Sequence, residues 1–151
     1  MISCNRHDDE GIYVYKEIVT EFEPRSQVLD WGNLTPEERR KYPRKGFVIN
    51  SEAEFPKVPN INMTDLKLMN IDFTRYTLLV HYFLIPGYVK SHRLLWFYDN
   101  ADDTYAFQSD FVTVYPDADS DEDDWFTYYR SAILVNKISS DSEVSFRYSY
   151  N

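Results

Sequence analysis

The residues best suited to chemistry form an acidic run in the second half of the chain. Carboxylates stand at alternate positions, with Asp117, Asp119, Asp121 and Asp123 as candidate cation ligands. Hard cations such as Ca²⁺ take several oxygen ligands, so alternating carboxylates can form a calcium loop. The EF-hand pattern is not met, because Glu122 stands where that loop needs a glycine. The run predicts either a cation site or, more simply, a solvated hairpin loop that keeps neighbouring strand edges soluble.

The three histidines are the next candidates. His81 and His92 are about equally distant from Pro86-Gly87, so a hairpin centred there would place them opposite each other, whereas His7 is remote from both. Two histidines are too few for a closed zinc site without carboxylate ligands. Ordinary strand histidines are therefore the simpler interpretation, and we expect no metal and no cofactor.

Catalytic motifs are lacking. The single cysteine, Cys4, has no histidine partner that would make it a nucleophile, and it excludes an internal disulfide. The sequence has no G-x-S-x-G turn, no HExxH and no glycine-rich phosphate loop. A hydrolase that uses paired carboxylates stays open as an alternative, although no pair stands out. The enzyme question is left open, and a protein without catalysis is favoured.

Aromatic residues make up 17% of the chain, a content that favours strands. Most of them should pack in the core or in cross-strand pairs. Trp96, Trp125 and Tyr128 are the candidates for a ligand-binding face that takes a sugar or a peptide.

The net charge of −9 repels phosphate backbones, so we expect no nucleic-acid partner. The only basic cluster lies at and just after the C-terminal end of a predicted short helix and consists of Arg39, Arg40, Lys41, Arg44 and Lys45. It is either a landing site for an anionic partner or lipid head groups, or simply the solvated end of a helix. No apolar run approaches the roughly 20 residues that cross a bilayer.

Most of these candidate residues lie in or next to predicted strands. The longest apolar stretch, Leu78–Ile85, is interrupted only by His81 and predicts a central strand covered on both faces. A turn at Pro86-Gly87 follows it. Further strands are predicted at 11–22, 46–50, 88–98, 104–115, 125–137 and 143–150, with a strand or an extended loop at 27–32.

Two short helices are predicted on the surface. Thr35 is a candidate N-cap, Pro36 occupies the first helical position, and Glu38 completes a capping box. Ser51 and Glu54 have the spacing of a second capping box, and prolines shortly afterwards prevent a long helix.

Together these elements predict a single mainly β domain over residues 11–151, an antiparallel sandwich or partly open barrel with one or two short surface helices. Short connections between the later strands imply antiparallel hairpins in a meander. Residues 1–10 are expected to form a disordered, lipoprotein-like tether.

The first four residues end like a bacterial lipobox, with an apolar, a branched and a small residue before Cys4. In lipoproteins such a cysteine is lipidated, which would place this protein in the cell envelope as an outer-membrane or periplasmic lipoprotein. A signal peptide also needs a basic start and an apolar stretch, which would have to lie upstream. The alternative is a free cysteine in a frayed terminus.

Three stretches then carry a family resemblance: Phe47–Phe55 with its S-x-x-E, Ile71–Val80 with its DF-x-x-Y-x-L-L, and Ala132–Ile138 with its L-V-x-K. Their order resembles that of a family of small lipoproteins from gut Bacteroidetes with no assigned activity, and more distantly the protease-complex-associated C-terminal domain. The resemblance implies a β-rich envelope domain, with no catalytic residues to carry over.

We therefore expect a non-catalytic, lipid-anchored domain that binds a protein or a glycan and meets the membrane only through its lipid. The alternatives are the carboxylate hydrolase and a protease-inhibitor-like module that presents a protruding loop, for instance at Pro86-Gly87. The oligomeric state is not predicted.

Overall fold

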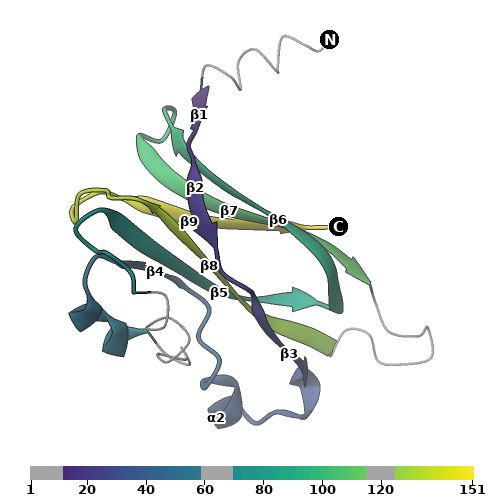
Figure 1. Ribbon diagram of the computed structural model, residues 1–151. Coiled ribbons are helices and arrows are strands. Elements are labelled where there is room, and N and C mark those ends of the chain that lie inside the picture. Colours follow the sequence, from purple (N-terminus) through teal and green to yellow (C-terminus); the bar gives the residue numbers. More distant parts are fainter. Residues whose placement is uncertain (1–11, 59–69, 115–124) are drawn as a thin grey trace, which may run out of the picture.

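The computed structural model describes residues 12–58, 70–114 and 125–151 of the chain. Two β-sheets pack face to face and do not close into a barrel (Figure 1). The predicted mainly β fold is confirmed, in its sandwich form.

The first sheet, sheet A, has four strands in the order β1-β6-β7-β9. Strand β6 is antiparallel to both β1 and β7, whereas β9 runs parallel to β7. The strands of sheet A are β1 (Tyr13–Tyr15), β6 (Tyr88–Asp99), β7 (Thr104–Val114) and β9 (Val144–Tyr150).

The second sheet, sheet B, is antiparallel and has the order β2-β8-β5-β4. Strand β3 also pairs with β8, along a part of β8 that β2 does not reach. The strands of sheet B are β2 (Ile18–Glu21), β3 (Arg25–Asp30), β4 (Gly46–Ile49), β5 (Tyr76–Pro86) and β8 (Trp125–Asn136).

The predicted meander is wrong at the Pro86-Gly87 turn, because β5 and β6 lie in different sheets. The turn is a corner of the sandwich: Gly87 has a φ of 75°, its N–H donates to the Trp125 carbonyl at 2.8 Å, and its carbonyl accepts from Thr127 Oγ1 at 2.5 Å. Strand β5 instead pairs with β8 over eleven positions. Of the predicted hairpins, β6–β7 forms as expected, whereas the parallel pairing of β9 does not fit a meander.

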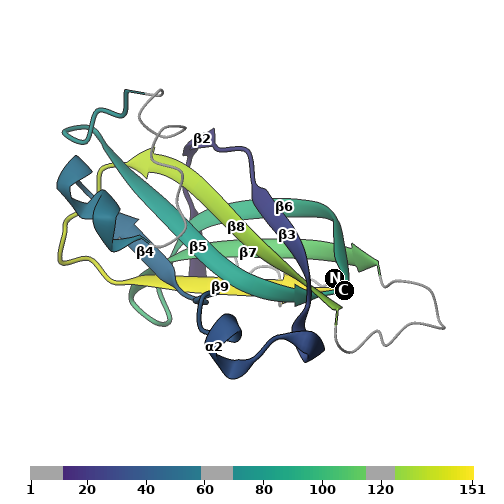
Figure 2. The same ribbon diagram turned by 90° about the horizontal axis from the view of Figure 1, so that it is seen from below.

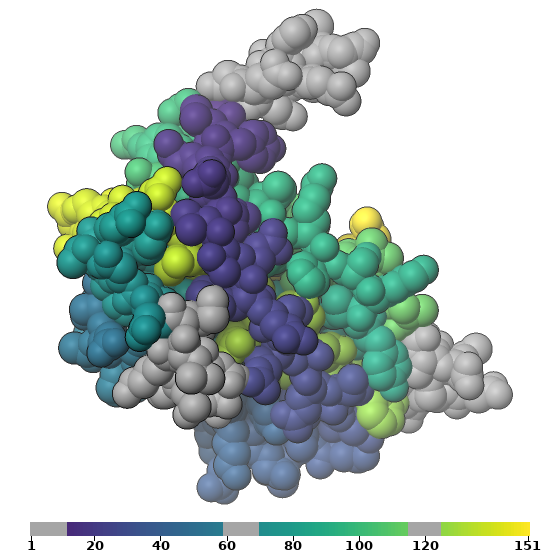
Figure 3. Space-filling model, in the orientation of Figure 1, coloured from purple at the N-terminus to yellow at the C-terminus, as the bar shows by residue number. Residues whose placement is uncertain are grey.

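The strand predicted at 11–22 is divided between the two sheets. Its first part, β1, pairs with β6 in sheet A, and its second part, β2, pairs with β8 in sheet B. The change of sheet explains the imperfect alternation of the sequence, since the face that is buried changes between the two parts. Figure 3 shows this N-terminal segment, in purple, as a continuous ridge across one face of the molecule.

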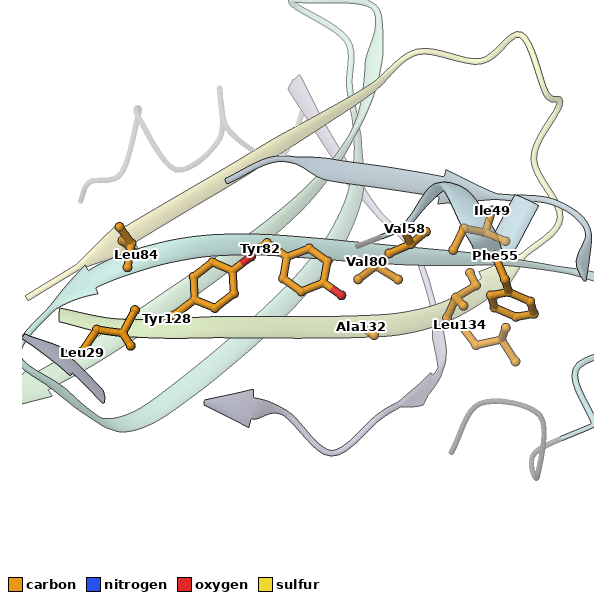
Figure 4. Close-up of a cluster of buried hydrophobic side chains, with 11 residues drawn as sticks. Leu29, Ile49, Phe55, Val58, Val80, Tyr82, Leu84, Tyr128, Ala132 and Leu134 are labelled. Carbon is orange, nitrogen blue, oxygen red and sulfur yellow. The ribbon is translucent and has the colours of Figure 1, made fainter. Parts of the chain in front are cut away.

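Sheet B is buried on both faces, as the apolar run in β5 predicted. Its inner face packs against sheet A through two clusters, centred on Leu79, Ile133, Trp96 and Phe107 and on Phe83, Ile85, Phe111 and Tyr129. Its outer face carries a third cluster, shown in Figure 4, which includes Val80, Tyr82, Tyr128, Ala132 and Leu134.

The described residues between β3 and β5, 31–45, 50–58 and 70–75, contribute side chains that pack on that outer face. They include the 3₁₀ helix η1 (Trp31–Asn33), the helix α2 (Pro36–Arg39) and the 3₁₀ helix η2 (Glu52–Lys57). Figure 1 shows α2 on the side of β5 and β8 that faces away from β6 and β7, and Figure 2 shows the same elements from below.

The predicted capping box of α2 is present. Thr35 Oγ1 accepts from the Glu38 N–H at 3.1 Å, and the Glu38 carboxylate accepts from the Thr35 N–H at 2.9 Å. The second predicted box is wrong, because the Ser51 side chain donates to the Glu54 carboxylate at 3.3 Å and caps no backbone N–H.

Candidate anion-binding site

Three polar side chains form a row across the outer face of sheet B. Arg130 lies in β8, directly opposite Arg25 of β3 on one side and Tyr82 of β5 on the other. Directly opposed residues of antiparallel strands project to the same face of a sheet. Arg130 shares that face with Tyr128, two residues before it. The register of three strands therefore brings two arginines and a tyrosine together.

The row opens into a hollow of about 390 Å³. Its roof comes from the segment after α2, which contributes Lys41 and Tyr42. The Tyr128 hydroxyl donates to the Pro43 carbonyl at 2.6 Å and ties this segment to the sheet. The lining residues are Arg25, Ser26, Gln27, Lys41, Tyr42, Tyr82, Tyr128 and Arg130.

Aromatic rings form one wall of the hollow. The rings of Tyr82 and Tyr128 are stacked at 5.7 Å between centroids, and Figure 4 shows them side by side. Tyr42 meets Tyr128 edge to face at 5.0 Å. Because neighbouring rings hold each other in place, this wall presents a fixed surface to the hollow.

Cationic side chains line the hollow although the chain as a whole has a net charge of −9. Three cationic side chains line it, Arg25, Lys41 and Arg130, and no carboxylate is among the described residues that do so. A group of like charges at a partly enclosed surface creates a local field that attracts anions.

Arg130 is the most buried of these cations, with 5% of its surface exposed. Its Nη2 donates to the Glu23 carbonyl at 3.4 Å, while its Nε–H has no hydrogen-bond partner among the described residues. Burial lowers the pKa of Arg130, the nearby Tyr82 opposes this effect, and Arg25 adds to it. A guanidinium nevertheless keeps its charge in proteins, so the site holds a buried cation.

Tyr82 is 1% exposed, and its hydroxyl likewise lacks a partner in the described part of the chain. Burial raises the pKa of Tyr82 to about 12. The phenol is therefore protonated at neutral pH and can donate a hydrogen bond. Two residues that line the hollow thus each have a buried donor without an acceptor among the described residues, an arrangement that typically costs about 1–3 kcal/mol for each group.

A second hollow, of about 520 Å³, lies next to the first and shares Tyr42 with it. It contains part of the basic cluster that the sequence singled out. Its lining residues are Trp31, Pro36, Arg39, Arg40, Tyr42, Pro43 and Arg44.

The aromatic residues proposed from sequence have different surroundings. Trp96 is 3% exposed and stacks on Tyr105 at 5.0 Å, which places it in the inner core. Trp125 is half-buried at the start of β8. Tyr128 is buried and lines the first hollow. A ligand-binding role for Trp96 and Trp125 stays a prediction, and neither lines the two hollows described above.

The two central histidines do not face each other, because β5 and β6 belong to different sheets. His81 is buried among the rings of Phe83, Phe107, Phe146 and Tyr148, at centroid distances of 4.7–6.3 Å. His92 Nδ1 is 2.9 Å from the Tyr129 hydroxyl. The predicted pairing across a Pro86-Gly87 hairpin is therefore wrong.

Two other candidate sites lie outside the described residues: Cys4, together with His7, and the acidic run with Asp117, Asp119, Asp121 and Asp123. Both stay predictions. Within residues 12–58, 70–114 and 125–151, no group of three or more His, Cys, Asp or Glu side chains is placed to hold a metal ion. No helix in these same ranges is long and apolar enough to cross a membrane.

No protein-family model, curated protein or solved structure matches this chain.

Sequence reasoning missed Arg25, Tyr82 and Arg130. One signal was available, since Arg130 is the only charge between Trp125 and Asn136 in an otherwise buried strand. A lone charge in such a strand needs a partner or a function. Its neighbours Arg25 and Tyr82 follow only from the strand register.

Proposed function

We propose that the protein is a non-catalytic binding domain and that the hollow beside Arg130 takes an anionic group of its ligand. One observation carries the proposal: Arg130 and Tyr82 line the same cationic hollow, and each has a buried donor, Arg130 Nε and Tyr82 Oη, that lacks an acceptor among the described residues. Buried donors in native proteins are nearly always satisfied, so an acceptor from a ligand fits this place.

The chemistry of the lining favours an oxyanion such as a carboxylate, sulfate or phosphate. A guanidinium offers planar, charged donors that match these groups, and hydrogen bonds between charged partners are about twice as strong as neutral ones. The Tyr82 hydroxyl can supply a further donor to the same anion. Arg25 and Lys41 add positive charge at the exposed side of the hollow.

The same lining supports binding over catalysis. No Asp, Glu, His or Cys is among the described residues that line the hollow, so it lacks the usual general bases and nucleophiles. Tyr82, with a pKa of about 12, does not act as a base at neutral pH. The hydrolase alternative, which needs two carboxylates, gains no support from this site.

The protease-inhibitor alternative relied on a protruding loop at Pro86-Gly87. Gly87 is buried and hydrogen-bonded to β8 on both its N–H and its carbonyl. This turn therefore offers no protruding loop to a protease.

A location in the cell envelope, with Cys4 lipidated, is part of the proposal. It is supported by the lipobox-like first residues and by the resemblance to Bacteroidetes lipoproteins. The intact mass of the protein purified from its own cells tests it: a diacylglyceryl mass on Cys4 is expected, and a free thiol with Met1 retained would refute it.

Calorimetric titration with galacturonate, sulfate and phosphate tests the binding proposal. At least one of these anions should bind the wild-type protein, and Arg130→Met should weaken that binding at least tenfold. Arg93→Met is the matched control, because the Arg93 side chain is 72% exposed and lies outside the hollow. Failure of all three anions to bind, or equal binding by Arg130→Met, would refute the proposal.

A further inference from the structure

The two cationic hollows are neighbours that share Tyr42. Tyr42 lines both, and its ring is held by edge contacts with Tyr128 at 5.0 Å and with Trp31 at 6.4 Å. These contacts hold Tyr42 in place, so a ligand that occupies both hollows has to pass this ring.

The second hollow, like the first, is lined by cationic side chains. Arg39, Arg40 and Arg44 line it, and no carboxylate is among its described lining residues. The nearest acids in the sequence are Glu37 and Glu38 of α2, and the Glu38 carboxylate already accepts the Thr35 N–H. Six cations therefore line the two hollows, from Arg130 at one end to Arg40 and Arg44 at the other.

The arginines of the second hollow differ in burial and in their hydrogen bonds to the protein. Arg39 is half-buried and donates through Nε and Nη2 to the Trp31 carbonyl at 3.2 and 3.0 Å. Arg40 and Arg44 are exposed side chains at its rim. Arg39 thus supports the structure of the hollow, whereas Arg40 and Arg44 can move toward a ligand.

Both hollows are much larger than a small inorganic ion. A water molecule takes about 30 Å³ in the liquid, whereas the two hollows measure about 390 and 520 Å³. A ligand that fills them has several rings or groups, with anionic groups at separated positions.

We infer that the ligand is an acidic oligosaccharide that spans both hollows, with one acidic group beside Arg130 and Tyr82 and another near Arg40 and Arg44. The inference rests on the proposed anion-binding function of the first hollow. Tyrosine rings and hydroxyls next to arginines can serve both the faces and hydroxyl groups of sugar rings and their acidic substituents.

Other polyanions fit the same observations less well. Duplex DNA carries a charge about every 1.7 Å along its whole axis, so the net charge of −9 repels it more strongly than a short ligand with a few acidic groups. Single strands are bound by stacking on aromatic faces, but the Trp31 ring has the guanidinium groups of Arg39 and Arg44 over it, at 5.4 and 6.0 Å. A flat bilayer can reach the exposed Arg40 and Arg44, but it cannot at the same time reach Arg130, which is 5% exposed.

Calorimetry on the full chain can test the inference. Galacturonate is compared with tetragalacturonate and a heparin tetrasaccharide, and maltotetraose is the neutral control. We expect at least one acidic tetrasaccharide to bind ten times or more tightly than galacturonate, and maltotetraose not to bind.

The double variant Arg40→Gln/Arg44→Gln should lose this gain in affinity while its affinity for galacturonate stays unchanged. Arg93→Gln should behave like the wild type.

The outcomes separate the two proposals. If an anion binds in an Arg130-dependent way but no acidic tetrasaccharide gains affinity through Arg40 and Arg44, the extended ligand is refuted and the anion site stands. If neither the small anions nor the tetrasaccharides bind, both are refuted. Tighter binding of a twelve-residue oligothymidylate or of phosphatidylglycerol vesicles, lost in the double variant, would overturn the assignment to a glycan.

Discussion

Arg25 and Arg130 stand directly opposite each other on the antiparallel strands β3 and β8. Like charges at opposed positions destabilise a sheet, and here one of the two guanidinium groups is buried. Arg130 also lowers the stability of the fold by leaving its Nε–H without an acceptor among the described residues. An anion in the adjacent hollow would relieve both effects, which is why stability and binding should respond in opposite directions to substitutions here.

Replacing Arg130 by methionine should leave the ligand-free protein as stable as the wild type, or stabilise it. Buried ion pairs can often be replaced by apolar residues of similar volume with no loss or with a gain of about 1–4 kcal/mol, and a buried cation with no ion-pair partner among the described residues should be at least as replaceable. Urea unfolding without added anions measures the change. The exposed control Arg93→Met should change the free energy of unfolding by no more than about 1 kcal/mol, the range of an exposed ion pair such as Arg93–Asp110. A large destabilisation by Arg130→Met would mean that Arg130 has a structural role.

Replacing Tyr82 by phenylalanine should raise the free energy of unfolding by about 1 kcal/mol. The change removes a buried hydroxyl that lacks a partner in the described structure and keeps the ring that stacks on Tyr128. For a chain of this length such a gain raises Tm by about 2–4 °C.

Tyr129→Phe is the matched control, because its hydroxyl is hydrogen-bonded to His92 Nδ1 at 2.9 Å. We expect it to lose about 0.5–1.5 kcal/mol of stability. Equal effects of the Tyr82 and Tyr129 substitutions would show that the Tyr82 hydroxyl has a partner after all.

Acidification should destabilise the protein through His81. Burial among aromatic rings lowers the pKa of His81 from 6.5 to about 4. Between these values the unfolded chain binds the proton and the folded chain does not, so stability falls as the pH falls from about 6.5 to about 4. The lost free energy is of the order of 3 kcal/mol, at 1.36 kcal/mol for each pKa unit.

His81→Leu should lose this part of the pH dependence, while the part due to carboxylates remains. The measurement is the free energy of urea unfolding at pH 7 and at pH 4.5 for both proteins. Identical pH dependence in the two would contradict a neutral, buried His81.

Gly46 of β4 lies against the ring of Phe146 in β9, at a contact between the two sheets. A Cβ at position 46 would lie 2.1 Å from Cγ of that ring. Gly46→Ala should therefore cost about 1–3 kcal/mol through overpacking. In a Phe146→Ala background the same substitution should cost much less, because the clash is removed. An unchanged cost in that background would contradict this contact.

The sequence predicted the location of strands and helices better than it predicted which strands pair. The apolar run Leu78–Ile85 correctly indicated a strand buried on both faces, and Thr35, Pro36 and Glu38 correctly located a capped helix. These features depend on local periodicity and hydrogen bonding. Strand pairing depends on contacts between distant residues, so the change of sheet at Pro86-Gly87 and the parallel position of β9 could not be read from local patterns.

The candidate site was missed for the same reason. Arg25, Tyr82 and Arg130 are separated by 48 or more positions in the chain and meet only because β3 and β5 both pair with β8. The basic cluster after α2 was visible in the sequence, but its position beside this row depends on how the segment folds over sheet B. Composition showed an acidic protein, and the fold gathers a minority of cations on one surface.

The most direct test follows the Arg130 Nε–H by NMR during titration of the full chain with galacturonate and with tetragalacturonate. Its signal is assigned by its absence from the spectrum of Arg130→Met, and the Arg93 Nε–H serves as an internal control. We predict that the Arg130 signal shifts and saturates as the anion binds, while the Arg93 signal stays in place. An Arg130 signal that does not move with these anions, nor with sulfate or phosphate, would contradict the assignment of this hollow as an anion-binding site.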